Sequence, residues 1–202
     1  IWATSITPIQ VPGGSVYGKL IDLQSRLNLN NIIDLETNIY SPQYRSFFYD
    51  CINLINTQLQ QQLMADTIFS HAVGQSPKPK LFDQLAEIRK IKSISIEDYI
   101  KIKPFLTTLP SLTPININTA SKEVLSCIHP QLSGSLVNKV IQKRKNKAFG
   151  IIDEFWTFAH TLLPNLTIDE IKENFPAKFI NTVSDYFLLE TRIVLEKNKL
   201  IG

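Results

Sequence analysis

Residues 1–33 have the pattern of an extended chain, and within residues 20–33 Leu27 and Leu29 alternate with polar residues. A Pro-Gly-Gly triplet interrupts this stretch, so the pattern predicts a turn at residues 12–15. After the turn, Val16, Leu20 and Leu23 are each flanked by polar residues. This spacing predicts a strand that runs to about Leu23.

The period changes to three or four residues after position 41. Ser41 is a good N-cap, and Pro42 occupies the favoured first helical position. The apolar positions that follow are Phe48, Cys51, Ile52, Ile55, Leu59 and Leu63. They predict an amphipathic helix of about six turns.

Shorter helices are expected from there to about residue 175. Two short helices are predicted between residues 85 and 103, the second with a Ser95–Asp98 capping pair. Thr119 is predicted to cap a helix ending near residue 128, and Ser133 to cap the next one. A further helix covers 152–159, and a capping box opens the helix after it at Thr167 and Glu170.

The last 25 residues return to a strand pattern. Leu189, Thr191, Ile193 and Leu195 alternate with the residues between them, and a turn is expected at 197–199. Because exposed strand edges promote aggregation, the economical arrangement is one sheet built from both chain ends. We therefore predict an α+β fold in which 1–35 and 176–202 form the sheet domain and 36–175 form an inserted helical domain.

Asparagines occupy the polar positions of two short alternating stretches, although asparagine is a poor strand former. The first is Leu27-Asn28-Leu29-Asn30-Asn31, and the second is Ile115-Asn116-Ile117-Asn118-Thr119. Asparagine side chains can satisfy buried backbone groups where a strand passes into a helix. The hypothesis is that these residues are structural hinges, with direct partner contact as the lesser alternative.

Composition limits the classes of function only weakly. The chain has 202 residues, a net charge of +3 and 44% hydrophobic residues, which is typical of a globular protein. It contains no apolar stretch of about 18 residues that could cross a membrane. Because it begins at Ile1, we expect a processed or trimmed chain, from which a targeting segment or anchor could have been removed.

The two cysteines, Cys51 and Cys127, lack a metal-binding spacing. Two buried thiols are the ordinary interpretation, and a disulfide in an oxidising compartment is the alternative.

No catalytic constellation is visible in the sequence. His71, His129 and His160 are not spaced as metal ligands. The paired carboxylates at 153–154 and 169–170 lie in predicted first helical turns, where the helix dipole accounts for them. The chain is therefore predicted not to be an enzyme.

A basic segment is the strongest alternative site. It comprises Lys139, Lys143, Arg144, Lys145 and Lys147. With the preceding helix it could form a helix-hairpin-helix module at about 115–160, which would bind nucleic acid through residues 119–147. Such a hairpin needs small residues, whereas the connection here is His-Pro-Gln-Leu-Ser-Gly-Ser. A solvated helix face explains the same charges.

Four ordered segments of this chain resemble those of one family. They are "DLQSRLNLNNI", the helices of "DQLAEIRKIKSISIEDYIKIKPFLTTLP", "PININTASKEVL" and the closing "VSDYFLLETRIVL". Together they resemble type II secretion system protein K, also called general secretion pathway protein K, a minor pseudopilin. Ser25 replaces a glycine of the family pattern, and Leu27 replaces a phenylalanine.

The resemblance implies a pilin-like fold with a large helical insertion. It also implies a non-enzymatic protein that caps the tip of the periplasmic pseudopilus and helps to start its assembly. The implied partners are the minor pseudopilins I and J and the major pseudopilin fibre, with no nucleic acid. A long N-terminal helix, absent from this chain, would anchor the protein in the inner membrane of a Gram-negative bacterium.

Calcium is the cofactor that the resemblance raises. Family members often carry an acidic calcium-binding loop, but the corresponding stretch here holds only Asp66 and Asp83. Because calcium takes six to eight oxygen ligands, several of them charged, no cofactor is expected at this position. A weaker calcium site built on backbone carbonyls is the alternative.

Overall fold

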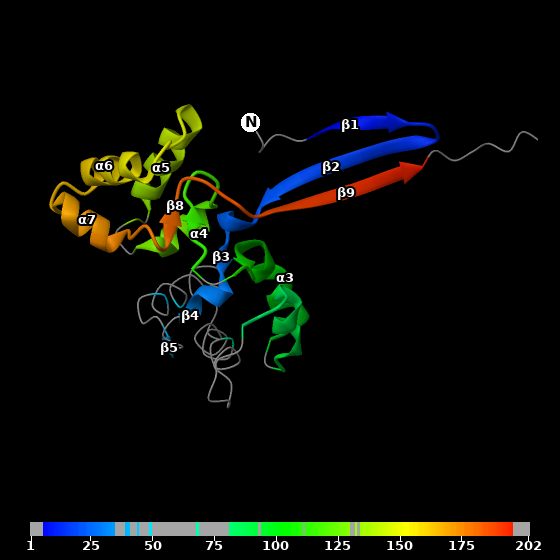
Figure 1. The fold of residues 1–202 in the computed structure, drawn as a ribbon, viewed down its shortest axis with the longest axis horizontal. Helices are drawn as coiled ribbons and strands as arrows, with labels where there is room; N and C mark the ends of the chain where they lie inside the picture. Colours follow the sequence, from blue (N-terminus) through cyan, green and yellow to red (C-terminus); the bar gives the residue numbers. More distant parts are fainter. Residues whose placement is uncertain are drawn as a thin grey trace, which may run out of the picture.

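A computed structural model describes residues 6–34, 39–40, 44, 49, 68, 81–92, 94–110, 112–129, 132 and 134–195. A narrow β-ribbon projects from a body made mainly of helices (Figure 1). The ribbon contains the first and last described strands, and the body contains the residues between them. The predicted α+β fold, with a sheet from both chain ends and a helical insertion, is confirmed.

The ribbon consists of three antiparallel strands. They are β1 (Ile6–Val11), β2 (Gly14–Asp22) and β9 (Phe187–Leu195), in the order β1-β2-β9. The predicted turn lies between β1 and β2, where Gly13 has a φ of 82° that favours glycine. Strand β9 pairs with β2 along its entire length, from Gly14–Leu195 to Asp22–Phe187.

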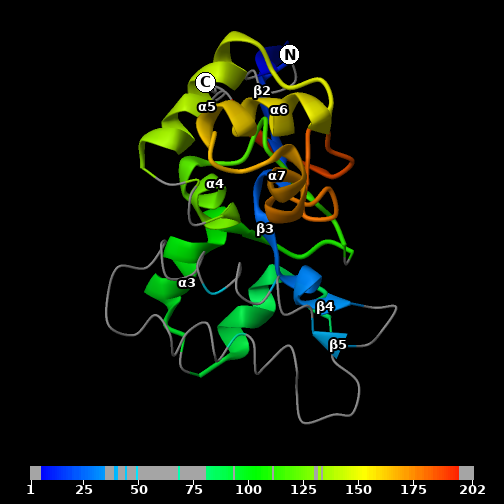
Figure 2. The same cartoon turned by 90° about the vertical axis from the view of Figure 1, so that its left-hand side faces the viewer.

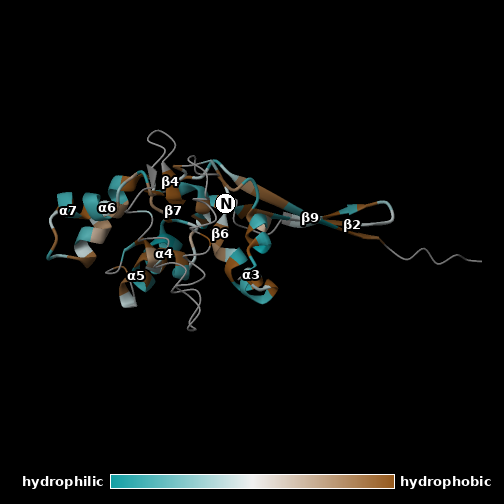
Figure 3. Cartoon of the chain, turned by 90° about the horizontal axis from the view of Figure 1, so that it is seen from below, coloured by the Kyte–Doolittle hydropathy of each residue, from teal (hydrophilic) through white to brown (hydrophobic). Residues whose placement is uncertain are grey.

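One face of the ribbon is apolar. Directly paired residues of neighbouring antiparallel strands point to the same side, so the register assigns each side chain to a face. This apolar face comprises Ile9, Val11, Val16, Leu20, Leu189, Ile193 and Leu195. Leu189, Ile193 and Leu195 are 56%, 64% and 75% exposed, so the described body does not cover this face. Figure 3 shows these hydrophobic stretches outside the body.

The body contains five described α-helices. They are α3 (Ile96–Ile102), α4 (Lys122–Ile128), α5 (Ser135–Asn146), α6 (Ile152–Leu162) and α7 (Ile168–Asn174). Short 3₁₀ helices cover Leu23–Ser25, Leu29–Ile32, Leu85–Lys90 and Lys103–Phe105. Viewed along the ribbon, α5, α6 and α7 lie in one half of the body and α3 in the other (Figure 2).

Three pairs of very short strands lie in the body, and two of them connect segments that are distant in sequence. Strand β3 (Leu27–Asn28) is parallel to β6 (Leu106–Thr107), and β7 (Ile115–Asn116) is parallel to β8 (Ile180–Asn181). Strands β4 (Ile33–Asp34) and β5 (Ile39–Tyr40) are antiparallel. Strands β3 and β8 therefore pair within the body, although they lie in segments assigned to the sheet domain. The domain boundaries at 35 and 176 stay a prediction.

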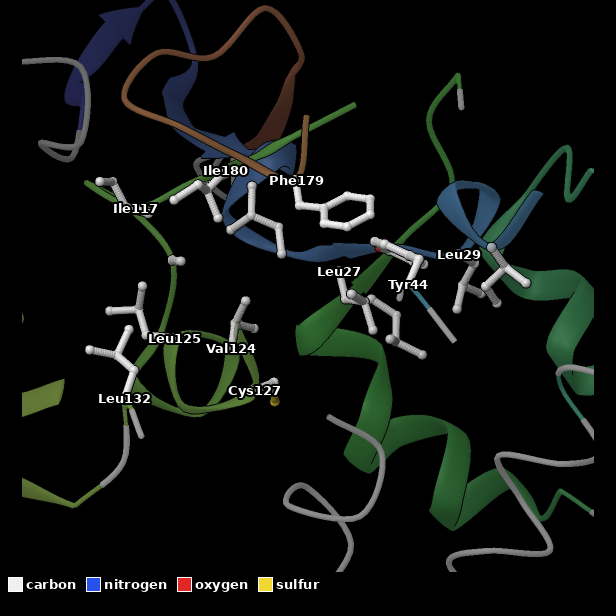
Figure 4. Packing of buried hydrophobic residues seen from close by; sticks show 14 of the residues in the cluster. Leu27, Leu29, Tyr44, Ile117, Val124, Leu125, Cys127, Leu132, Phe179 and Ile180 are labelled. Atoms are coloured by element: carbon white, nitrogen blue, oxygen red, sulfur yellow. The ribbon is translucent and has the colours of Figure 1, made fainter. Parts of the chain in front are cut away.

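The hydrophobic core lies in the body. Buried residues from both halves form one cluster, including Leu27, Leu29, Val124, Leu125 and Ile180 (Figure 4). The short strands β3 and β8 contribute fully buried side chains to it. The core therefore extends from the start of the chain's first asparagine stretch to the segment just before β9.

Helix caps agree with the sequence at two places. Ser95 accepts a hydrogen bond from the Asp98 amide (3.1 Å) at the start of α3. Thr167 and Glu170 form the predicted capping box of α7. The backbone N–H of Thr167, and then its hydroxyl, hold the pKa of Glu170 below its ordinary value.

Two helix caps in the structure differ from the caps predicted from the sequence. Ser121, not Thr119, caps α4, because the Thr119 hydroxyl donates to Asp22 instead. Gly134, with a φ of 58°, precedes α5, and Ser133 lies outside the described residues. Most of the long helix predicted after Ser41 also lies outside them, although Tyr44 and Tyr49 are helical.

Candidate functional site

The first asparagine stretch joins three segments of the body. Asn28 Oδ1 accepts the amide N–H of Asn30 (3.1 Å) and that of Leu109 (2.9 Å). Its Nδ2 donates to Asn31 Oδ1 (2.8 Å) and to the Pro110 carbonyl (2.9 Å). Asn28 is therefore buried with both side-chain polar atoms satisfied by the protein.

The other two asparagines of the first stretch, Asn30 and Asn31, contact different loops. Asn30 Oδ1 accepts from the Phe82 N–H (2.8 Å), while its Nδ2 donates to the carbonyls of Phe82 (3.0 Å) and Leu109 (2.9 Å). Asn31 holds both backbone groups of Thr113, accepting its N–H (3.0 Å) and donating to its carbonyl (2.8 Å). An amide side chain thus replaces a strand neighbour for each of these backbone segments.

The second stretch makes equivalent contacts. Asn116 Oδ1 accepts the Asn118 N–H (2.9 Å). Asn118 accepts the Phe149 N–H (2.9 Å) and donates to the carbonyls of Phe149 (2.9 Å) and Thr182 (2.9 Å). In both stretches the first asparagine closes a local turn, and the second holds the backbone of a distant phenylalanine. The equivalent residues are Asn28 and Asn116, Asn30 and Asn118, and Phe82 and Phe149.

The equivalence continues beyond the asparagines. After each phenylalanine the next amide donates to a glutamate, from Asp83 to Glu87 (2.7 Å) and from Gly150 to Glu154 (2.9 Å). Helices α3 and α7 start with the similar sequences Ser-Ile-Glu-Asp and Thr-Ile-Asp-Glu. Each leads to a strand that pairs in parallel with its own asparagine stretch. The body therefore contains two units that share this set of contacts, a first unit between Asn28 and Thr107 and a second unit between Asn116 and Asn181.

A buried carboxylate attaches the ribbon to the second unit. Asp22, the last residue of β2, is only 3% exposed. Its Oδ1 accepts the Gln24 N–H (2.8 Å). Its Oδ2 accepts from the Thr119 hydroxyl (2.5 Å), the Ser184 hydroxyl (2.7 Å) and Asn116 Nδ2 (3.3 Å). Asp22 therefore joins three segments where the ribbon meets the body.

Gln24 strengthens this junction. Its Nε2 donates to the Pro114 carbonyl (3.0 Å), and its Oε1 accepts the amides of Asp185 (2.5 Å) and Tyr186 (3.3 Å). Neither Asp22 nor Gln24 was predicted from the sequence. The available signal was an acidic residue at the end of an apolar strand, directly before the first asparagine stretch.

The basic segment is only partly available to a ligand. Arg144 donates to the Ile117 carbonyl (2.5 Å), and burial lowers its pKa. Lys143 donates to the Lys147 carbonyl (3.2 Å) and lies 5.0 Å from the centre of the Phe149 ring. Lys139, Lys145 and Lys147 are exposed. Arg144 therefore connects α5 with the second asparagine stretch, whereas Lys143 makes only local contacts at the end of α5. Nucleic-acid binding stays an untested alternative.

The cysteine and calcium predictions also stay untested. Cys127 is buried, and its thiol donates to the Glu123 carbonyl (3.0 Å), whereas Cys51 lies outside the described residues. Asp83 is exposed, and Asp66 is not described. Over the described ranges, no three His, Cys, Asp or Glu side chains are grouped to hold a metal ion.

Among the helices that the structure describes, none combines the length and the apolar character that a membrane crossing requires.

Comparison with known proteins gives consistent matches. A family model described as "Type II secretion system (T2SS), protein K" matches residues 115–170. Type II secretion system protein K of Pseudomonas aeruginosa is 24% identical over 177 residues, which cover 76% of this chain and 52% of that protein. The chain therefore spans about half the length of this curated relative.

A solved structure matches over nearly the whole chain. It is the crystal structure of the GspK–GspI–GspJ complex from the enterotoxigenic Escherichia coli type 2 secretion system. The match has a TM-score of 0.74 at 19% identity, and it covers 97% of this chain and 75% of the matched chain.

A sheet built from both chain ends, carrying a large helical insertion, is the fold that this chain shares with the matched structure. In sequence, the chain is similar to type II secretion system protein K. The resemblance recognised from the sequence motifs is thereby confirmed.

Proposed function

We propose that this chain is the periplasmic part of a minor pseudopilin of a type II secretion system. It caps the tip of the pseudopilus, helps to initiate its assembly and has no catalytic activity. The observation that carries the proposal is a bulky helical body attached through Asp22 to a ribbon with an exposed apolar face.

The apolar face supports the assembly part of the proposal. Exposed apolar surface of this extent on a ribbon is typical of a site that another element covers. An apolar helix packed along this face would cover its exposed side chains and continue to the inner membrane. The minor pseudopilins I and J and the major pseudopilin fibre are the proposed neighbours, since the matched structure is a complex that includes GspI and GspJ.

The helical body supports the capping part. It lies at one end of the ribbon and is much wider than the ribbon (Figure 1). A subunit stacked on the ribbon from that side would collide with the body. A cap of this kind acts by exclusion of volume and requires no reactive group.

Light scattering on mixed components tests the proposal. We expect this chain and the soluble parts of the I- and J-type pseudopilins to form a complex with the summed mass of all three. The matched control is the Lys145→Glu/Lys147→Glu variant, which alters exposed charges of α5 and should assemble normally. A chain that stays separate from both partners, but binds duplex DNA with strong salt dependence, would favour the alternative.

A further inference from the structure

Strand β9 forms an exposed edge of the ribbon. It pairs with β2 on one side, and in the part of the chain that the structure describes no strand or helix lies along its other side (Figure 1). Each described residue of β9 is exposed. An edge of this kind presents backbone N–H and C=O groups to another strand.

The two edges of the ribbon differ in their protection. Strand β1 contains Pro8, and its register with β2 is irregular between Ile6 and Ile9. Both features discourage the addition of a strand. Strand β9 has no proline, and its register with β2 is unbroken over all 9 residues. Of the two edges of the ribbon, only β9 therefore offers a regular row of backbone groups to another strand.

The sequence of β9 is complementary to itself when read antiparallel. When Thr191 lies opposite Thr191 of a second β9 strand, each of the next three positions on either side pairs residues of opposite charge or two apolar residues. These pairs are Glu190 with Arg192, Leu189 with Ile193, and Leu188 with Val194. Opposite-charge, apolar and Thr–Thr pairs are the cross-strand combinations that stabilise antiparallel sheets.

We propose that β9 is a self-association edge whose partner is a second copy of this chain. Two β9 strands pair antiparallel about a two-fold axis at Thr191 and join two three-stranded ribbons into one sheet. Residues that face each other have the same parity, so the two apolar faces lie on the same side. The two bodies lie at opposite ends of the joined sheet because the strands run in opposite directions.

The charged residues of β9, Glu190 and Arg192, lie where they can pair with a second β9 strand. Arg192 lies 4.9 Å from the centre of the Tyr17 ring on β2, and Glu190 is directly opposite Lys19. All four side chains line an open depression of about 530 Å³ on the ribbon. Glu190 of a second copy would therefore approach Arg192 from the side away from β2. This inference goes beyond the proposed function, because it involves no other pseudopilin.

Charge reversal on the complete 202-residue chain tests the proposal. A single strand junction is small, so dimerisation should be weak and visible by sedimentation between roughly 5 and 500 µM. Glu190→Arg or Arg192→Glu alone creates two like-charge pairs per dimer and should raise Kd about tenfold or more. The double variant restores both attractions and should restore the dimer.

The most discriminating experiment mixes the Glu190→Arg variant with the Arg192→Glu variant. One copy then carries two arginines and the other two glutamates, so we expect a heterodimer although neither variant dimerises alone. This result cannot arise from misfolding. A chain that is monomeric at all concentrations, or a dimer that ignores the charge reversals, would overturn the proposal. Because no I- or J-type partner is present, the result is independent of the proposed function.

Cysteine cross-linking tests the register. Thr191→Cys places two thiols across the axis, within the Cα separation that a disulfide requires, and should give a covalent dimer on mild oxidation. Leu189→Cys is the control, since its two copies would lie roughly 13 Å apart along the strands. The parent chain measures the background from Cys51 and Cys127. Equal cross-linking of both variants would indicate face-to-face association and contradict the proposal.

Discussion

At the scale of single residues, buried amides hold distant segments of backbone together. Asn30 and Asn118 each make three hydrogen bonds to main-chain groups, two of them to one phenylalanine. Asparagine suits this task because its side chain carries a donor and an acceptor in the same plane, as a peptide group does. The sequence indicated that these residues matter where strands pass into helices. Their role as hinges stays a prediction.

Replacing Asn30 by alanine tests that role. The loss of three bonds to buried backbone groups should lower the free energy of unfolding by about 3 kcal/mol. Asn118→Ala should have a similar effect, because its contacts are equivalent. The control is Asn138→Ala on the exposed side of α5, which should stay within about 0.5 kcal/mol. Unchanged urea denaturation of Asn30→Ala, together with lost partner binding, would assign the residue to partner contact instead.

His129 adds a pH dependence at the end of α4. Burial lowers its pKa below the ordinary 6.5, and its ring lies 5.1 Å from that of Phe175. The unfolded chain therefore binds a proton in a pH range where the folded chain does not. The contribution of His129 to stability is complete above pH 6.5 and is lost as the pH falls toward its folded pKa.

The test is the difference between two unfolding series. His129→Gln should flatten the fall in the free energy of unfolding between about pH 7 and pH 5. His160→Gln serves as the control, because it removes the other described histidine. If both variants retain the slope of the parent chain, His129 does not contribute as stated.

At the scale of elements, local sequence predicted where helices occur but not every cap. The capping pairs of α3 and α7 were recognised because both partners lie within four residues. Thr119 was assigned to α4 on equally good local grounds. Its hydroxyl is instead used by Asp22, a residue far away in sequence, and Ser121 takes the capping position. A long-range contact decided between two plausible caps.

The corrected cap makes a specific prediction. Ser121→Ala should lower the free energy of unfolding by about 1 kcal/mol and speed hydrogen exchange of the Val124 amide, which loses its partner. Thr119→Val should also destabilise the chain, through Asp22, but should leave that amide protected. Faster exchange at Val124 in the Thr119 variant alone would restore the original assignment.

At the scale of the whole molecule, the described part of the chain contains a ribbon and two units with equivalent contacts. The repeat was not recognised from the sequence, because the equivalent residues are few and widely spaced. Hydrogen bonds reveal it, since they show which side chains perform the same task. The Asp22 junction was missed for the same reason, as its donors come from the 116–119 and 184 regions. In the sequence, the apolar face of the ribbon was visible only as an alternation of apolar and other residues along the strands.

The sequence by itself determined the order of the elements, the sheet built from both ends and the family resemblance. These depend on local periodicity and short motifs, which are fixed along the chain. Only the tertiary structure decided which distant backbone each asparagine holds, which hydroxyl caps α4 and which residue joins ribbon to body. The physical reason is that a polar side chain has many possible partners, and folding alone selects the few that become buried beside it.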